Sequence, residues 1–166
     1  MSGTSSETET GTGIGIGTGI GTGTGTGTRP TIMESDDAAF VAAFEDCTLP
    51  PERFHHADHV RLAWLLLGED DLPHALVRFC EGLKRYAASL GKAGLYHETI
   101  TVAYLLLVQD RRQAGGTAET FEEFTRWNPD LFVWRPSILE RYYRPETLAS
   151  ARAREGFVLP DRRPAA

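Results

Sequence analysis

A repeat in which glycine alternates with threonine or isoleucine fills residues 10–28 and limits where the chain can form a core. Ten of the 17 glycines precede residue 29. The repeat has no apolar periodicity that a core would bury, and glycine loses the most conformational entropy on ordering. We therefore predict a disordered low-complexity tail over residues 1–33 and one helical domain over residues 34–166.

The origin of this tail has two explanations. A near-perfect dipeptide repeat resembles an expanded coding repeat, and Met33 stands shortly after it, so translation starting naturally at Met33 is one hypothesis. The other hypothesis is a flexible tether. Mass spectrometry of the native N-terminus distinguishes the two.

The size and charge of the domain exclude several classes of protein. Residues 34–166 are enough for one hydrophobic core and too few for two. The formal net charge is −6, of which Glu7, Glu9 and Arg29 in the tail contribute −1, which leaves −5 for the domain. A mildly acidic domain with scattered basic residues lacks the basic surface that nucleic acid requires, so we expect no nucleic-acid partner.

Membrane insertion and secretion are also not expected. The longest apolar runs, Leu62–Leu67 and Val102–Val108, are far shorter than the roughly 20 residues that span a bilayer. The N-terminus has no basic start followed by an apolar segment, and Cys47 and Cys80 are far apart in sequence. These features predict a cytoplasmic protein with reduced cysteines.

Helical periodicity dominates the domain. Apolar residues recur at spacings of three and four, and no stretch outside the tail alternates convincingly, so we predict an all-α fold. Short loops favour a single-domain antiparallel helical bundle with a wrapped C-terminal segment. We expect the tryptophans Trp64, Trp127 and Trp134 to be core anchors. The predicted helices run from Ser35 to Cys47, His56 to Leu67, Pro73 to Leu90, Tyr96 to Gln113, from about Thr117 to Asn128, and from Pro145 to Glu155.

Four of the five histidines lie at the starts of two predicted helices. His55, His56 and His59 open the first of these helices, and His97 stands at the start of the other. Imidazole is costly to bury unless its nitrogens find partners. Because residues three and four apart share a helix face, His56 and His59 are neighbours. We expect the two helix starts to converge on one centre.

Such a centre has the chemistry of a mononuclear metal site. Imidazoles bind divalent transition metals, and a carboxylate compensates the charge of the metal. We predict one zinc, iron or copper ion, which the sequence does not distinguish, bound by His56, His59, His97 and Glu98. Glu98 is alternatively the general base, and Tyr96, Tyr104 or Thr101 orients the ligand. The predicted function is a small cytoplasmic metalloenzyme acting hydrolytically or oxidatively on a small organic molecule.

Other hypotheses fit the same residues. The helix starts can form a non-catalytic pocket whose imidazoles bind a small molecule, or merely satisfy backbone groups in a helical interaction protein. Two histidines at H-x-x-H spacing are a weak signal, and Thr101 stands where a zincin motif needs a second histidine. Whether His55 replaces His56 in the site, and the oligomeric state, stay open.

Several segments together resemble a family of small bacterial proteins that are mostly uncharacterised. The resemblance covers about residues 40–162 and implies an all-helical domain, with no activity to transfer. It is carried by Phe54 to Trp64 (FHHADHVRLAW), Tyr96 to Thr101 (YHETIT), Arg141-Tyr142-Tyr143 and Ala151-Arg152.

Overall fold

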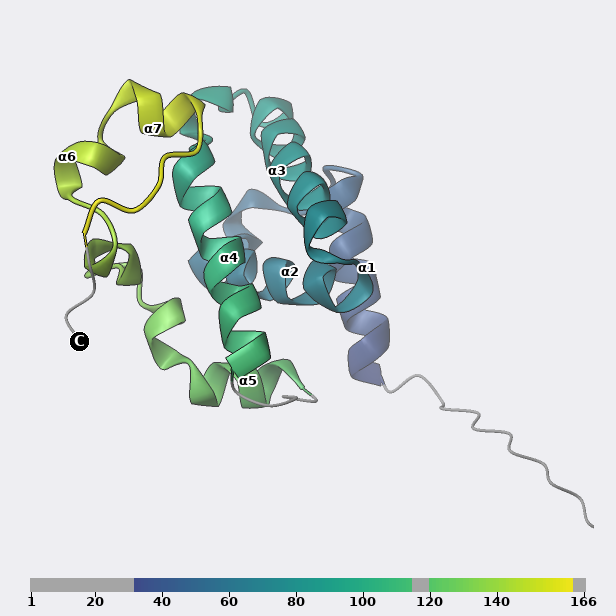
Figure 1. Cartoon of the computed structure of the whole chain (residues 1–166). Helices are drawn as coiled ribbons and strands as arrows, with labels where there is room; N and C mark the ends of the chain where they lie inside the picture. Colours follow the sequence, from purple (N-terminus) through teal and green to yellow (C-terminus); the bar gives the residue numbers. More distant parts are fainter. Residues whose placement is uncertain (1–31, 115–119, 163–166) are drawn as a thin grey trace, which may run out of the picture.

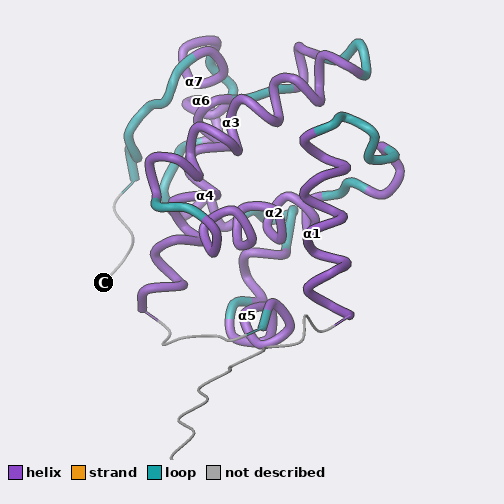
Figure 2. Tube along the Cα trace, turned by 90° about the vertical axis from the view of Figure 1, so that its right-hand side faces the viewer, coloured by secondary structure: helices purple, strands orange, loops and turns teal. Residues whose placement is uncertain are grey.

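The computed structural model describes residues 32–114 and 120–162, and all regular structure in these ranges is helical (Figures 1 and 2). The predicted all-α fold is therefore confirmed for these residues. Residues 1–31 of the predicted tail lie outside the described residues. The α-helices are α1 (Ile32–Glu45), α2 (His56–Glu69), α3 (Leu72–Ser89), α4 (Glu98–Ala114), α5 (Phe121–Trp127), α6 (Pro145–Leu148) and α7 (Ala151–Glu155). Short 3-10 helices span Pro51–Arg53, Ala93–Leu95, Pro129–Phe132 and Ile138–Arg141.

Two predicted helix limits are wrong. The first helix begins at Ile32 rather than after Ser35. The predicted helix from Pro145 to Glu155 is two short helices, α6 and α7. The break lies at Ser150, whose hydroxyl oxygen accepts the Ala153 N–H at 3.1 Å and so caps a new helix.

The core is centred on α2, which packs against both α3 and α4. In its apolar run Leu62–Leu67 every residue except Trp64 is buried, as the sequence predicts. Helix α1 packs so closely on α3 that a Cβ atom added to Gly82 would lie only 2.5 Å from the Phe44 ring. Glycine at this position thus allows the two helices to approach.

The tryptophans do not all anchor the core. Trp64 packs against Phe121 and Phe124, with ring centroids 5.6 and 6.3 Å away. Trp127 and Trp134 are 51% and 49% exposed, so the prediction is wrong for these two. Trp127 is the last residue of the short helix α5 and Trp134 lies in a turn, and neither segment is long enough for its apolar spacing to indicate an inward face.

The C-terminal residues lie against the start of α4. Thr99 Oγ1 donates to the Gly156 carbonyl at 2.9 Å and accepts the Val158 N–H at 3.1 Å. The Tyr143 hydroxyl donates to the Val158 carbonyl at 3.0 Å. These bonds, with the packing of α7 on α4, fix the first turn of α4 relative to the C-terminal part. Within the two described ranges, no helix combines the length and apolar character needed to cross a bilayer.

Candidate functional site

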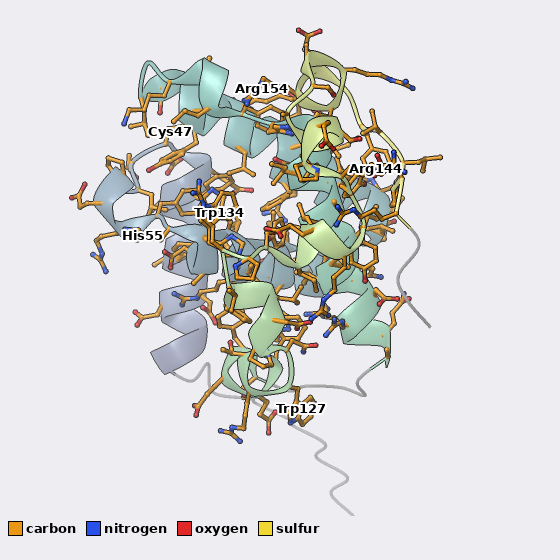
Figure 3. All side chains as sticks on the ribbon, turned by 90° about the vertical axis from the view of Figure 1, so that its left-hand side faces the viewer. Cys47, His55, Trp127, Trp134, Arg144 and Arg154 are labelled. Atoms are coloured by element: carbon orange, nitrogen blue, oxygen red, sulfur yellow. The ribbon has the colours of Figure 1, made fainter. Side chains whose placement is uncertain are left out.

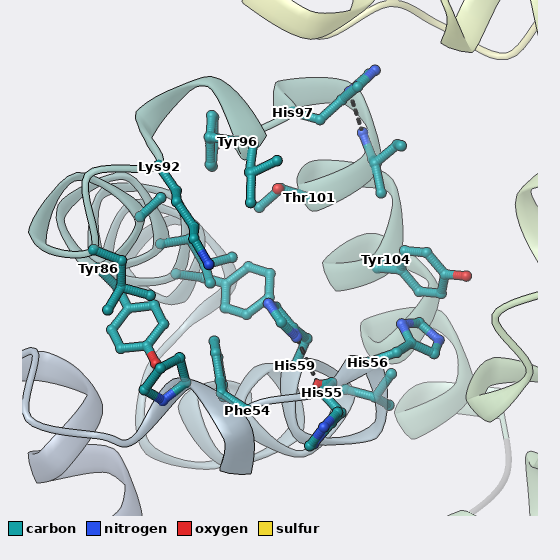
Figure 4. Close-up of a pocket in the computed structure, with 18 of the residues that line it drawn as sticks. Phe54, His55, His56, His59, Tyr86, Lys92, Tyr96, His97, Thr101 and Tyr104 are labelled. Atoms are coloured by element: carbon teal, nitrogen blue, oxygen red, sulfur yellow. Dashed lines mark hydrogen bonds between the residues drawn. The ribbon is translucent and has the colours of Figure 1, made fainter.

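A cavity of about 660 Å³ lies between the starts of α2 and α4, one side of α3 and the loop joining α3 to α4 (Figure 4). The polar and charged residues that line it are His55, His56, His59, Lys92, His97 and Thr101. The aromatic ones are Phe54, Phe79, Tyr86, Tyr96, Tyr104 and Trp134. The remaining described lining residues are aliphatic or proline, and none carries a carboxylate.

The tyrosines present their rings to the cavity, while their hydroxyls are bonded elsewhere. Tyr86 donates to the buried Leu49 carbonyl at 2.9 Å, and Tyr96 donates to Glu98 at 3.0 Å. The Tyr104 hydroxyl bonds that of Ser137 at 2.8 Å. Burial is the largest of the causes that raise the pKa of all three phenols, so they stay protonated at neutral pH. These residues therefore form an aromatic wall.

His59 projects into the cavity from the first turn of α2 (Figure 4). Its Nδ1 lies 2.7 Å from the His55 carbonyl. A carbonyl only accepts, so Nδ1 carries the proton and Nε2 is an acceptor. Burial, the largest cause, lowers the pKa of His59 and keeps the ring neutral.

The acceptor on His59 is free within the described part of the protein. Nε2 has no hydrogen-bond partner there, and it is not among the fully buried unpaired polar atoms, so it is reachable from the cavity. The ring itself is held in place by Phe54, whose centroid is 4.1 Å away with 30° between the planes. The cavity thus holds a fixed, neutral imidazole with an unused lone pair.

His56 likewise bonds a backbone carbonyl through one ring nitrogen, and its Nδ1 has no hydrogen-bond partner among the described residues. Its Nε2 lies 2.9 Å from the Leu131 carbonyl and donates to it. The ring contacts Tyr104 and Trp134, with centroids 4.8 and 5.2 Å away. Burial lowers the pKa of His56, as it does for His59. His56 therefore connects α2 to the 3-10 helix Pro129–Phe132 and forms one side of the cavity.

His97 has both ring nitrogens occupied. Nδ1 accepts the Ile100 N–H at 3.3 Å, which caps the first turn of α4 (Figure 4). Nε2 donates to the Leu148 carbonyl at 2.8 Å and so connects α4 to α6. The side chain is buried, being only 8% exposed. His97 has no free nitrogen for a ligand in this arrangement.

Glu98 and His55 also lie away from the centre that the sequence predicts. Glu98 accepts from Tyr96 and pairs with Lys84 at 3.3 Å, and it is not part of the cavity wall. The side chain of His55 is 71% exposed and projects outward at the edge of the molecule (Figure 3). Its backbone N–H donates to Asp58 at 2.8 Å, which stabilises the start of α2.

The predicted convergence is therefore partial. The structure brings His56, His59 and His97 to one cavity, but each bonds a backbone carbonyl and Glu98 faces elsewhere. Among the described side chains, no group of three or more His, Cys, Asp or Glu residues is arranged to hold a metal ion. Metal binding by this chain stays a prediction.

Sequence reasoning did not identify several residues of the cavity. Phe54 and Tyr86 supply its aromatic wall and Lys92 its charge, yet none was predicted as a site residue. Phe54 stands directly before the histidine cluster, which is the only local signal. Tyr86 belongs to the apolar stripe of α3 and cannot be told from a core residue by spacing alone.

Comparison of the chain with protein-family models, with curated proteins and with solved structures finds no match.

Proposed function

We propose that this protein binds a small organic molecule with a largely apolar body in the cavity, and that His59 accepts a hydrogen bond from it. The volume of about 660 Å³ is within the roughly 300–1,000 Å³ of small-molecule sites. Such sites combine apolar walls with a few placed polar groups. The observation that carries the proposal is the unpaired Nε2 of a neutral, immobilised His59 in an aromatic cavity.

The Thr101 hydroxyl supplies a second polar group. Thr101 lines the cavity from α4 (Figure 4). No hydrogen bond of this hydroxyl to another described residue is found. Since a hydroxyl both donates and accepts, it complements the acceptor on His59. A ligand with an N–H or O–H group is therefore favoured.

The neutral aromatic amine N-phenyl-1-naphthylamine tests this proposal, because it has one N–H donor and fluoresces more strongly in apolar surroundings. We expect saturable binding of one probe per chain. Thr101→Trp should fill the cavity and abolish binding of the probe. The control Leu106→Trp also introduces a tryptophan on α4, but at a partly exposed residue outside the cavity, and should preserve binding of the probe. Absence of saturable binding, or equal binding by both variants, would refute the proposal.

The metal-dependent enzyme predicted from the sequence is a competing hypothesis. Elemental analysis of protein purified without chelator separates the two. The proposal expects probe binding that is unchanged by EDTA. Stoichiometric metal that is lost in His59→Ala, together with probe binding that EDTA removes, would favour the metalloprotein.

A further inference from the structure

Among the described residues, Lys92 is the only lysine or arginine on the cavity wall, and no carboxylate accompanies it there. The side chain extends from the loop between α3 and α4 toward the interior of the cavity (Figure 4). The chain has one other lysine, Lys84, which pairs with Glu81 at 2.9 Å and Glu98 at 3.3 Å. Lys92 has no such ion pair with any described residue.

The backbone that carries Lys92 is fixed on both sides. Its N–H donates to the Ala87 carbonyl at 2.8 Å. Gly91, in the left-handed conformation (φ 68°), allows the chain to turn at the end of α3 so that this bond can form. Further along the loop, Arg154 of α7 donates to the carbonyls of Gly94 and Tyr96 at 3.1 and 3.3 Å (Figure 3). The ammonium group is therefore on a flexible stem whose base is held beside the cavity.

The surroundings favour an anion at this position. The protein as a whole carries a net charge of −6, so a cavity with one cation and no carboxylate differs from the rest of the molecule. A carboxylate accepts a charge-assisted hydrogen bond from an ammonium group.

We infer that the ligand is an aromatic carboxylic acid whose ring lies between the aromatic walls and whose carboxylate meets Lys92. This inference rests on the proposed function and adds the chemical class of the ligand. The cavity thus recognises the carboxylate through Lys92 and the apolar body through its aromatic walls.

Calorimetric titration with 2-naphthoate and 2-naphthamide tests the inference, because the two compounds have nearly the same shape and differ in charge. We expect the wild type to bind the acid about tenfold more tightly than the amide, in keeping with a hydrogen bond between charged groups. Lys92→Met removes this preference and leaves the affinity for the amide unchanged. Arg85→Met removes a charge from an exposed residue of α3 outside the cavity and retains the preference.

Each remaining outcome overturns the inference. Equal affinity for acid and amide in the wild type, or a preference that survives in Lys92→Met, shows that Lys92 does not select a carboxylate. The proposed function survives either result if Thr101→Trp still abolishes binding of N-phenyl-1-naphthylamine. If neither naphthalene compound binds, the inference fails, and the amine probe separately decides the proposed function.

Discussion

His59 at the start of α2 and His97 at the start of α4 line the same cavity, but their ring nitrogens are used differently. His97 accepts from Ile100 and donates to Leu148, so both nitrogens serve the fold. His59 donates to the His55 carbonyl, and its Nε2 has no partner among the described residues. Similar helix starts thus carry one imidazole that the fold uses fully and one that, in the function we propose, accepts a hydrogen bond from a ligand.

The largest expected effect on stability is that of His97→Phe. The substitution removes the cap of α4 and the bond to α6, and each such interaction contributes about 1 kcal/mol. We expect a loss of about 2–3 kcal/mol in the free energy of unfolding, measured by urea denaturation. His97→Asn, which keeps a capping acceptor, should recover part of the loss. A change below about 0.5 kcal/mol in His97→Phe would contradict the structural role.

His59→Phe should lower the affinity for a ligand while changing the stability of the fold little. The His55 carbonyl keeps the backbone N–H groups of Asp58 and His59, at 3.0 and 3.1 Å, so no acceptor is left unpaired. We expect the free energy of unfolding to change by less than about 1 kcal/mol, while the affinity for N-phenyl-1-naphthylamine falls about tenfold. Fluorescence titration measures the second quantity. Unchanged affinity would remove His59 from the site.

The pH dependence of stability should show the contribution of the buried, neutral His59. Burial, the largest cause, lowers the pKa of His59 and His56 in the folded state, so the unfolded chain binds more protons below about pH 6.5. Stability is then fully present above this pH and is lost as the pH falls from there toward the folded-state pKa values. We expect the melting temperature to fall between about pH 7 and pH 5, and to fall less in His59→Phe. An unchanged slope in this variant would contradict a buried neutral imidazole.

The smallest effect is expected for Glu98→Gln. Glu98 pairs with Lys84, whose side chain is 41% exposed, and such pairs contribute about 0–1 kcal/mol. We expect a loss of at most about 1 kcal/mol in the free energy of unfolding and unchanged binding of N-phenyl-1-naphthylamine. Loss of bound metal or of probe affinity in Glu98→Gln would instead support the metal ligand or base predicted from the sequence.

Much of the helical architecture could be predicted because its signals are local. The apolar run after His59 predicts the buried half of α2, and the proline near the start of α3 and Gly91 at its end limit that helix. The predicted helix limits were wrong where a capping residue inside the segment was overlooked. Ser150 caps α7 and divides a helix that periodicity alone extends from Pro145 to Glu155.

The candidate site could be predicted only in outline. Sequence spacing selected the two histidine-bearing helix starts, and both do line the cavity. Spacing did not indicate that Tyr86 and Lys92 complete it, because an aromatic residue on a helical stripe and a lysine in a loop are ordinary features of core and surface. Nor did it indicate that Glu98 turns toward Lys84.

By itself, the sequence determined that the regular structure of the described residues is helical and which turns carry imidazole, because periodicity and capping act over a few residues. Tertiary structure alone decided which imidazole nitrogen is free. The carbonyls of Leu131 and Leu148 are 75 and 51 residues away in sequence from the histidines that they bind. A hydrogen bond consumes a lone pair or a proton wherever packing brings its partner, so His97, with two partners, has no ring nitrogen left for a ligand, whereas His59, with one, does.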